Sequence, residues 1–191
     1  RSLLGREWGD DLARRFPRVA IRAGRGSSKS LLGACFAARH ALTARVAGLA
    51  AGEVAMVPVV APKLRLTRFV LGFLRGFAQA QPLFRAELIG DPLTDVVRLA
   101  RGVEIEARAA DKGGLSMRGG PVLAAVMDEA NFFRDETTGV VNDKDIVEAA
   151  EARLVPGGQV LLISSSWVET GLFFDLYDAD FGRSRDVLVL N

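Results

Sequence analysis

The sequence contains very little cysteine and histidine, and each scarcity limits the chemistry open to the protein. The single cysteine, Cys35, excludes a disulfide within the chain and favours a reducing compartment. Because Cys35 stands among apolar residues, we expect it to be a small buried residue of the core. The single histidine, His40, is predicted to be a helix-surface or packing residue rather than a catalytic one.

Long apolar segments and targeting signals are also missing from the sequence. No apolar run reaches the ~18–20 residues that a membrane-spanning helix needs, and no signal peptide is visible. We therefore expect no membrane partner. The chain begins with Arg1 rather than Met, and we expect it to be a fragment of a longer protein.

The composition is that of an ordinary globular domain with a small net charge. Of the 191 residues, 49% are hydrophobic and 25% are charged, and the net charge is +2. Proteins that live on nucleic acid often carry a stronger basic bias. Arginines far outnumber lysines, and arginine offers planar, bidentate contacts to phosphate. The composition is thus compatible with phosphate chemistry.

Apolar periodicity predicts helices and strands in alternation. The predicted helices cover residues 2–16, 30–46, 63–80 and 143–155. The predicted strands cover residues 18–23, 53–62, 121–130, 159–167 and 186–191, with a hairpin-like pair at 93–110 that turns at Gly102. Alternating strands and helices indicate a mostly parallel sheet that is covered on both faces. The sequence therefore predicts one α/β domain over residues 1–191.

Several local features carry more specific expectations. Pro58 predicts an edge, an end or a kink in the strand at 53–62. Asp143 is the predicted cap of the helix at 143–155, and Pro156-Gly157-Gly158 is predicted to turn the chain. The apolar side chains expected to face inward from the helix at 63–80 are Leu66, Phe69, Val70, Phe73, Leu74 and Phe77.

The stretch AGRGSSKS, residues 23–30, resembles a phosphate-binding loop. It departs from the pattern G-x-x-x-x-G-K-[ST] at both glycine positions, where Ala23 and Ser28 stand. It nevertheless follows an apolar strand and opens an apolar helix, and Gly24 and Gly26 allow the backbone to bend. If the position of Ser28 needs a positive φ, serine costs ~1 kcal/mol or more there.

The chemistry of such a loop follows from its place at a helix start. Backbone N–H groups there carry partial positive charge and bind anions. Lys29 would reach the β- and γ-phosphates of a nucleotide, Ser30 would coordinate Mg²⁺, and Arg25 would add a second cation. The predicted nucleotide-binding residues of the loop are Gly24, Arg25, Gly26, Ser27, Ser28, Lys29 and Ser30. The alternative is a Gly/Ser-rich turn that carries an exposed lysine.

Two further strand ends carry polar side chains. Asp128 and Glu129 close the apolar strand VLAAVMD, and Ser164, Ser165 and Ser166 close the strand LLISSS. A carboxylate beside Mg²⁺ stays ionised, whereas one a step away can accept a proton. The serines would lie at the end of a neighbouring strand, where their hydroxyls could sense the γ-phosphate of a bound nucleotide. The alternatives are a solvated strand end for the acids and a merely polar strand end for the serines.

Together the stretches AGRGSSKS, VLAAVMDEANFF and LLISSSWVETG, in that order, resemble the ATPase domain of the large terminase subunit of tailed phages, the DNA-packaging motor. This resemblance implies a three-layer P-loop NTPase fold of the ASCE (RecA-like) type. It also implies hydrolysis of ATP with Mg²⁺ and translocation of double-stranded DNA into a procapsid. Its implied partners are a ring-forming homo-oligomer on a portal and a small terminase subunit, in the cytoplasm of an infected bacterium. A nuclease domain is expected downstream of this chain.

The resemblance also implies roles for particular residues. Lys29 and Arg25 would act on the phosphates and Glu129 would be the catalytic carboxylate, whereas Ser30 and Asp128 would hold Mg²⁺. Residues 164–166 would couple hydrolysis to movement, with Ser165 beside the nucleotide. Many members of this family need an arginine from the next subunit, for which Arg85 and Arg118 are the candidates, although Arg118 could equally act within its own chain.

Two other functions remain open from the sequence. One is a helicase or another ASCE ATPase with the same core. The other is an assembly module that binds a nucleotide without turnover, which the substitutions at Ala23 and Ser28 favour slightly. GTP is disfavoured, because DEAN stands where a GTPase would carry D-x-x-G.

Overall fold

The structure of the protein is a computed structural model. It describes residues 16–43, 46, 49–91, 95–110, 119–134, 139–140, 142–165, 169–183 and 186–191. The helix predicted at 2–16 lies outside the described residues except for Phe16, and so do Arg118 and Ser166.

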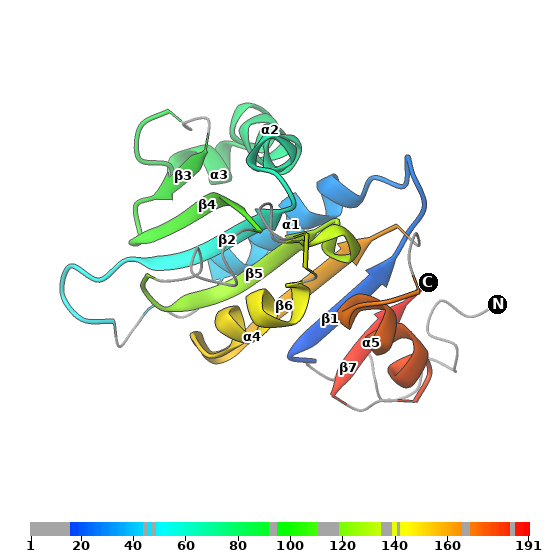
Figure 1. The fold of residues 1–191 in the computed structure, drawn as a ribbon. Coiled ribbons are helices and arrows are strands. Elements are labelled where there is room, and N and C mark those ends of the chain that lie inside the picture. Colours follow the sequence, from blue (N-terminus) through cyan, green and yellow to red (C-terminus); the bar gives the residue numbers. More distant parts are fainter. Residues whose placement is uncertain are drawn as a thin grey trace.

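In the described residues a single sheet runs through the molecule, with the strand order β3-β4-β2-β5-β6-β1-β7 (Figure 1). The strands are β1 (Arg18–Arg22), β2 (Ala55–Ala61), β3 (Val96–Leu99), β4 (Val103–Ala109), β5 (Val122–Asp128), β6 (Leu154–Ser164) and β7 (Val187–Leu190). All neighbouring strands are parallel except β3 and β4, which form the predicted antiparallel pair around Gly102. The predicted mostly parallel sheet is confirmed.

Helices cover both faces of this sheet (Figure 1). They are α1 (Lys29–Thr43), α2 (Leu64–Ala80), α3 (Pro82–Ala86), α4 (Asp143–Glu151) and α5 (Leu172–Asp180), with the short 3₁₀ helix η3 (Ala130–Phe132). Side chains of α1 and α2 pack with Val57 and Val126 on one face, and those of α4 and α5 pack with Met127 on the other. Strands β2 and β5 are buried along their whole length, so the predicted three-layer α/β architecture is confirmed.

Helix α1 packs on the sheet through small residues. Its buried residues are Gly33, Ala34, Ala37, Ala38, His40 and Ala41. A Cβ added at Gly33 would lie 3.1 Å from Cγ1 of Val126 in β5. Cys35 is exposed, so its predicted burial is wrong. His40 is buried, with its ring centroid 4.5 Å from that of Phe36, as expected of a packing residue. The small face lets the start of α1 lie close to the end of β5.

Helix α2 turns to the sheet a face that agrees only in part with the predicted one. Its buried residues are Thr67, Val70, Leu71, Leu74 and Ala78. Phe69 and Phe73 are 64% and 41% exposed, so their predicted inward orientation is wrong. Apolar side chains extend around more of α2 than one sheet face can cover. Val70 and Leu74 meet the sheet as predicted, and the two phenylalanines are left outside.

Two local predictions around the sheet are corrected, and the prediction for Pro58 is narrowed. Pro58 lies in a central strand between β4 and β5, where the register with β5 shifts between Met56 and Val59. Of the three predicted alternatives, this irregularity agrees with a kink and not with an edge or an end. Residues 156–158 do not turn the chain, because β6 begins at Leu154 and runs through them with a register shift against β5. Helix α4 accordingly ends at Glu151, and its N-cap is Asn142 rather than Asp143.

Sequence reasoning missed the shorter elements α3, η3 and α5. Helix α3 has five residues and η3 has three, so periodicity has too few turns to register there. Helix α5 does carry apolar residues at helical spacing, and that pattern was overlooked. None of the helices in the described ranges is long and apolar enough to cross a membrane.

Candidate nucleotide site

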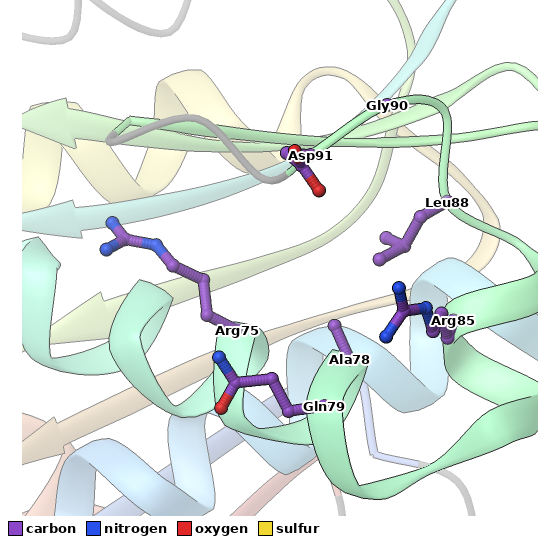
Figure 2. A pocket seen from close by; sticks show the side chains of 7 residues that line it. All are labelled: Arg75, Ala78, Gln79, Arg85, Leu88, Gly90 and Asp91. Carbon is purple, nitrogen blue, oxygen red and sulfur yellow. The ribbon is translucent and has the colours of Figure 1, made fainter.

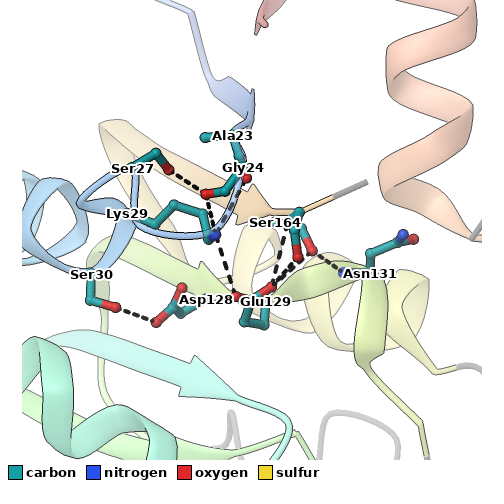
Figure 3. Close-up of polar contacts among 10 residues, drawn as sticks. Ala23, Gly24, Ser27, Lys29, Ser30, Asp128, Glu129, Asn131 and Ser164 are labelled. Atoms are coloured by element: carbon teal, nitrogen blue, oxygen red, sulfur yellow. Dashed lines mark hydrogen bonds and ion pairs between the residues drawn. The ribbon is translucent and has the colours of Figure 1, made fainter. Parts of the chain in front are cut away.

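Three strand ends meet at one edge of the sheet. Strand β6 lies between β1 and β5, and all three are parallel. Their carboxyl ends therefore place Arg22, Asp128 and Ser164 side by side, and the loop that follows β1 lies over this edge. Figure 3 shows the resulting polar contacts, which join residues of the loop, the acidic pair and the serine strand end.

The loop between β1 and α1 bends through two residues with positive φ. Gly26 has φ 76° and Ser28 has φ 59°. The Ala23 N–H donates to the Ser164 carbonyl oxygen at 3.0 Å, which fastens the loop to β6. The Leu32 N–H donates to the Ser28 carbonyl oxygen at 3.0 Å, so α1 starts directly after Ser28. Serine thus occupies a left-handed position that costs roughly 1–2 kcal/mol for a non-glycine residue.

Lys29 holds its ammonium at the centre of the loop. Its Nζ donates to the carbonyl oxygens of Gly24 at 3.0 Å and Ala23 at 3.3 Å, and it lies 3.6 Å from Oε1 of Glu129. Ser27 Oγ donates to the Gly24 oxygen at 2.6 Å and shapes the same turn. The side chain of Lys29 is only 9% exposed. A nearly buried cation in front of helix-terminal N–H groups is suited to binding phosphate.

Ser30 and Asp128 form the second part of the site. Ser30 Oγ donates to Asp128 Oδ2 at 3.3 Å. Burial raises the pKa of the Asp128 carboxyl above its ordinary value, and nearby Glu129 raises it further, whereas the Ser30 hydrogen bond and the Lys29 charge lower it. Asp128 is 4% exposed, and its Oδ1 is buried without a hydrogen-bond partner. An unsatisfied carboxylate oxygen beside a hydroxyl fits a hard cation such as Mg²⁺.

Ser30 and Asp128 offer a hydroxyl and a carboxylate at this position. The described residues contain no group of three or more His, Cys, Asp or Glu side chains that could hold a metal. Mg²⁺ commonly takes one or two carboxylates and completes its shell with water and substrate phosphates. Ser30 and Asp128 are therefore the residues that would hold the cation.

Glu129 has a left-handed backbone and a different environment from its neighbour. Its φ is 54°, which is uncommon for a residue with a side chain. Its Oε2 accepts hydrogen bonds from Ser165 Oγ at 3.2 Å, from the Ser165 N–H at 3.4 Å and from Ser164 Oγ at 3.4 Å. Its side chain is 29% exposed. Asp128 is thus buried beside Ser30, whereas Glu129 reaches both Lys29 and the serine strand end.

Ser164 connects three elements. Its buried Oγ donates to Glu129 and accepts the Asn131 N–H at 3.2 Å. Asn131 belongs to η3, so the strand end of β6, the carboxylate and the turn after β5 share one network. The sequence did not indicate that Asn131 belongs to this network. Its backbone N–H makes the contact, and every residue except proline has such a donor.

A cavity of about 740 Å³ lies over this edge of the sheet. Its lining residues are Arg25, Gly26, Ser27, Ser28, Lys29, Ser30, Leu31, Leu66, Phe69, Phe73, Asp128 and Glu129. One wall is polar and comes from the loop and the acidic pair. The other is apolar and comes largely from α2, and its residues were predicted as core. The structure therefore brings most of the predicted site residues to one cavity, with Ser165 bonded to Glu129 behind it.

No protein-family model and no curated protein matches the sequence. The fold is similar to the large terminase of bacteriophage HK97, with a TM-score of 0.67 and 16% identity over 92% of this chain and 35% of that one. It is also similar to the large terminase ATPase domain of Thermus phage P74-26, with a TM-score of 0.61 and 16% identity over 98% and 82% of the two chains.

The chain has the fold of a phage large terminase ATPase domain. A third structure, the large terminase of a thermophilic bacteriophage, agrees, with a TM-score of 0.62 and 14% identity over 94% of this chain and 41% of that one. The chain spans about a third of the length of the HK97 large terminase, where the covered share is 35%. The predicted P-loop fold class is confirmed.

Arg85, which the sequence analysis named as a candidate catalytic arginine, lies away from the cavity over the phosphate loop. It follows α2, which begins beside the phosphate loop and runs to Ala80 at its far end. Figure 2 shows Arg85 with Arg75 and Asp91 around a separate cavity of about 510 Å³. Arg85 does not line the cavity over the phosphate loop, so any action on that site would have to come from a second copy of the chain.

Proposed function

We propose that this chain is the ATPase domain of a DNA-packaging motor, which hydrolyses ATP with Mg²⁺ to move double-stranded DNA into a procapsid. The observation that carries the proposal is the convergence of Lys29, Ser30, Asp128 and Glu129 on one cavity. The similarity of the fold to phage large terminases supports it. In this chain the residues come from the start of α1, directly after the loop that follows β1, and from the end of β5.

Each residue has a role that its surroundings favour. The loop N–H groups and Lys29 bind the β- and γ-phosphates, and Arg25 adds positive charge at the cavity wall. Ser30 and Asp128 hold Mg²⁺, which when bound neutralises negative charge on the phosphates. Glu129 accepts a proton from the attacking water. Its carboxylate is partly exposed, and the hydrogen bonds that it accepts hold it in place.

The serine strand end is the proposed link from hydrolysis to movement. Ser164 and Ser165 donate to the same oxygen of Glu129, so any displacement of that carboxylate changes the end of β6. We further propose that the chain works in a ring on a portal with a small terminase subunit in the infected cell. Arg85 or Arg118 of the next copy would act on the phosphates.

The proposal is tested by separating nucleotide binding from turnover. We expect Lys29→Ala to lose both labelled-ATP binding and phosphate release, and Glu129→Gln to bind ATP with Mg²⁺ while phosphate release falls by about 10²-fold or more. Lys144→Ala and Glu148→Gln are matched controls, because both side chains are exposed on α4. Full turnover in Glu129→Gln would remove the assigned base.

The DNA part of the proposal needs its own measurement. We expect ATP-dependent displacement of a triplex-forming strand from double-stranded DNA by the assembled protein, without separation of the duplex strands. Unwinding of the duplex would indicate a helicase instead. ATP binding without phosphate release, even in the ring on DNA, would indicate an assembly module.

A further inference from the structure

The outward face of α2 carries exposed phenylalanines and glycines that packing within the described residues does not require. We define this outer α2 face by Arg65, Arg68, Phe69, Gly72, Phe73 and Gly76. Phe69 is 64% exposed and Phe73 is 41% exposed, one helical turn apart. Adjacent exposed aromatic side chains rimmed by polar residues are typical of interaction surfaces. Both also line the cavity over the phosphate loop, so a partner docked here would adjoin that cavity.

The two glycines of this face point to a close neighbour outside the chain. Gly72 and Gly76 lie inside α2, where each costs about 1 kcal/mol relative to alanine. A Cβ added at either position would meet nothing within 4 Å. Packing within the described residues therefore does not require glycine here. Small residues four apart on a helix let another backbone approach closely.

The charge of the outer α2 face selects the kind of partner. Helix α2 contains arginines and no acidic residue. Arg65 and Arg68 are exposed and make no ion pair in the part of the chain that the structure describes. Pairing two outer α2 faces in a symmetric dimer would bring these like charges together. The face instead suits an acidic surface.

Helix α5 offers such a surface on the opposite side of the molecule. It contains Asp175, Asp178 and Asp180 and no basic residue. Asp175 and Asp178 are exposed beside the small residue Ala179. Helix α5 packs against β1 and β7 at one edge of the sheet, whereas α2 packs on the other face beside β2, β3 and β4 (Figure 1). The basic and the acidic surface thus cannot meet within one chain.

We propose that the outer α2 face of one copy docks on the acidic face of α5 in a second copy. Such a contact joins different surfaces of the two copies, so it is head-to-tail and repeats from copy to copy, closing into a ring where the rotation allows. For its biological setting the inference rests on the proposed function, since a ring is the assembly proposed there. The docking itself requires neither nucleotide nor turnover.

Charge exchange between the two surfaces tests the pairing. We expect Arg65→Glu/Arg68→Glu and Asp175→Arg/Asp178→Arg, each alone, to weaken self-association at least about tenfold in analytical ultracentrifugation. A mixture of the two variants should associate again, because the acidic α2 of one then meets the basic α5 of the other. Lys144→Glu is the control for a change of charge on another exposed helix, and it should associate as the unchanged protein does.

A second variant guards against loss of folding. Gly72→Leu/Gly76→Leu should raise the free energy of unfolding, because leucine favours the helix and meets no atom of the chain, and should still abolish association. The proposal would be overturned if any of the α2 or α5 variants associated as strongly as the unchanged protein. It would also be overturned if the mixture of the two charge-exchanged variants did not associate. Lys29→Ala should associate normally, so failure of the nucleotide site and failure of the docking surface are distinguishable.

Discussion

Ser30 Oγ lies 3.3 Å from Asp128 Oδ2, although 98 positions separate the two residues in the chain. The contact joins the first turn of α1 to the last residue of β5. Gly33 lets α1 lie close to the same strand, because an added Cβ would stand only 3.1 Å from Val126 Cγ1. The hydroxyl and the carboxylate can therefore share one cation, and the unpartnered Oδ1 of Asp128 is the oxygen still available to it.

Asp128→Asn should remove most of the stabilisation that Mg²⁺ adds in the presence of ATP. In the unchanged protein, we expect ATP with Mg²⁺ to raise the free energy of unfolding more than ATP alone does. A ligand at a hundred times its Kd raises that free energy by about 2.7 kcal/mol. The variant should lose most of the Mg²⁺-dependent increment, because an amide is a poor ligand in place of a carboxylate. Thermal unfolding with ATP and increasing Mg²⁺ measures this. Asp145→Asn on exposed α4 is the control, and an equal Mg²⁺ increment in both variants would contradict the assignment.

Ser28→Gly should relieve strain in the phosphate loop. Removing the side chain at φ 59° recovers roughly 1–2 kcal/mol, and the freedom that glycine adds to the unfolded chain offsets about 0.5–1 kcal/mol of it. We expect a small net rise in the free energy of unfolding, measured in urea. Ser27→Gly is the matched control and should be destabilised, because it loses the hydrogen bond to the Gly24 oxygen without relieving any strain. Equal effects of the two changes would argue against strain at Ser28.

Ser164→Ala should mainly lower the stability of the fold, whereas Ser165→Ala should mainly change the rate of phosphate release. Ser164→Ala leaves the buried Asn131 N–H without its acceptor and should cost about 1–3 kcal/mol of unfolding free energy. Ser165→Ala should change stability by less than about 0.5 kcal/mol. It should still alter the rate of phosphate release, because its hydroxyl makes the shortest hydrogen bond to Glu129. Urea denaturation and single-turnover hydrolysis distinguish the two, and a Ser165→Ala protein with normal turnover would contradict the proposed coupling.

Asp143 should stabilise the junction of α4 and α5 in a pH-dependent way. Its Oδ2 accepts the Leu172 N–H at 2.6 Å, and burial raises the pKa of its carboxyl above the ordinary value. Asp143→Ala should cost about 1.5–3 kcal/mol, because that N–H loses its acceptor. Asp143→Asn should cost less, because its amide oxygen can still accept.

The sign of the pH effect follows from the direction of the Asp143 pKa. A carboxyl with a raised pKa binds more protons in the folded protein, so its contribution is fully present below the unfolded pKa and is lost as pH rises through the folded pKa. The unchanged protein should therefore gain stability relative to Asp143→Asn as the pH falls from 7 toward 4. Urea unfolding at several pH values measures this, and a difference that is constant with pH would contradict it.

The sequence by itself predicted the strand ends that form the candidate site. AGRGSSKS, Asp128-Glu129 and the serines of LLISSS are local patterns, and each sits at the carboxyl end of an apolar strand. Parallel strands gather such ends at one edge, so the convergence followed from the fold class alone. The possible positive φ of Ser28 was visible in the same way, because the pattern places glycine there.

Tertiary structure decided which faces were buried. Periodicity marks Phe69 and Phe73 as apolar together with Val70 and Leu74, but it does not state how much of α2 the sheet can cover. Only Val70 and Leu74 of these four are buried. The left-handed backbone of Glu129 also has no sequence signal, because it is imposed by the turn from β5 into η3 and by contacts with β6. Local patterns determined which side chains were available, and the limited area between layers determined which of them met.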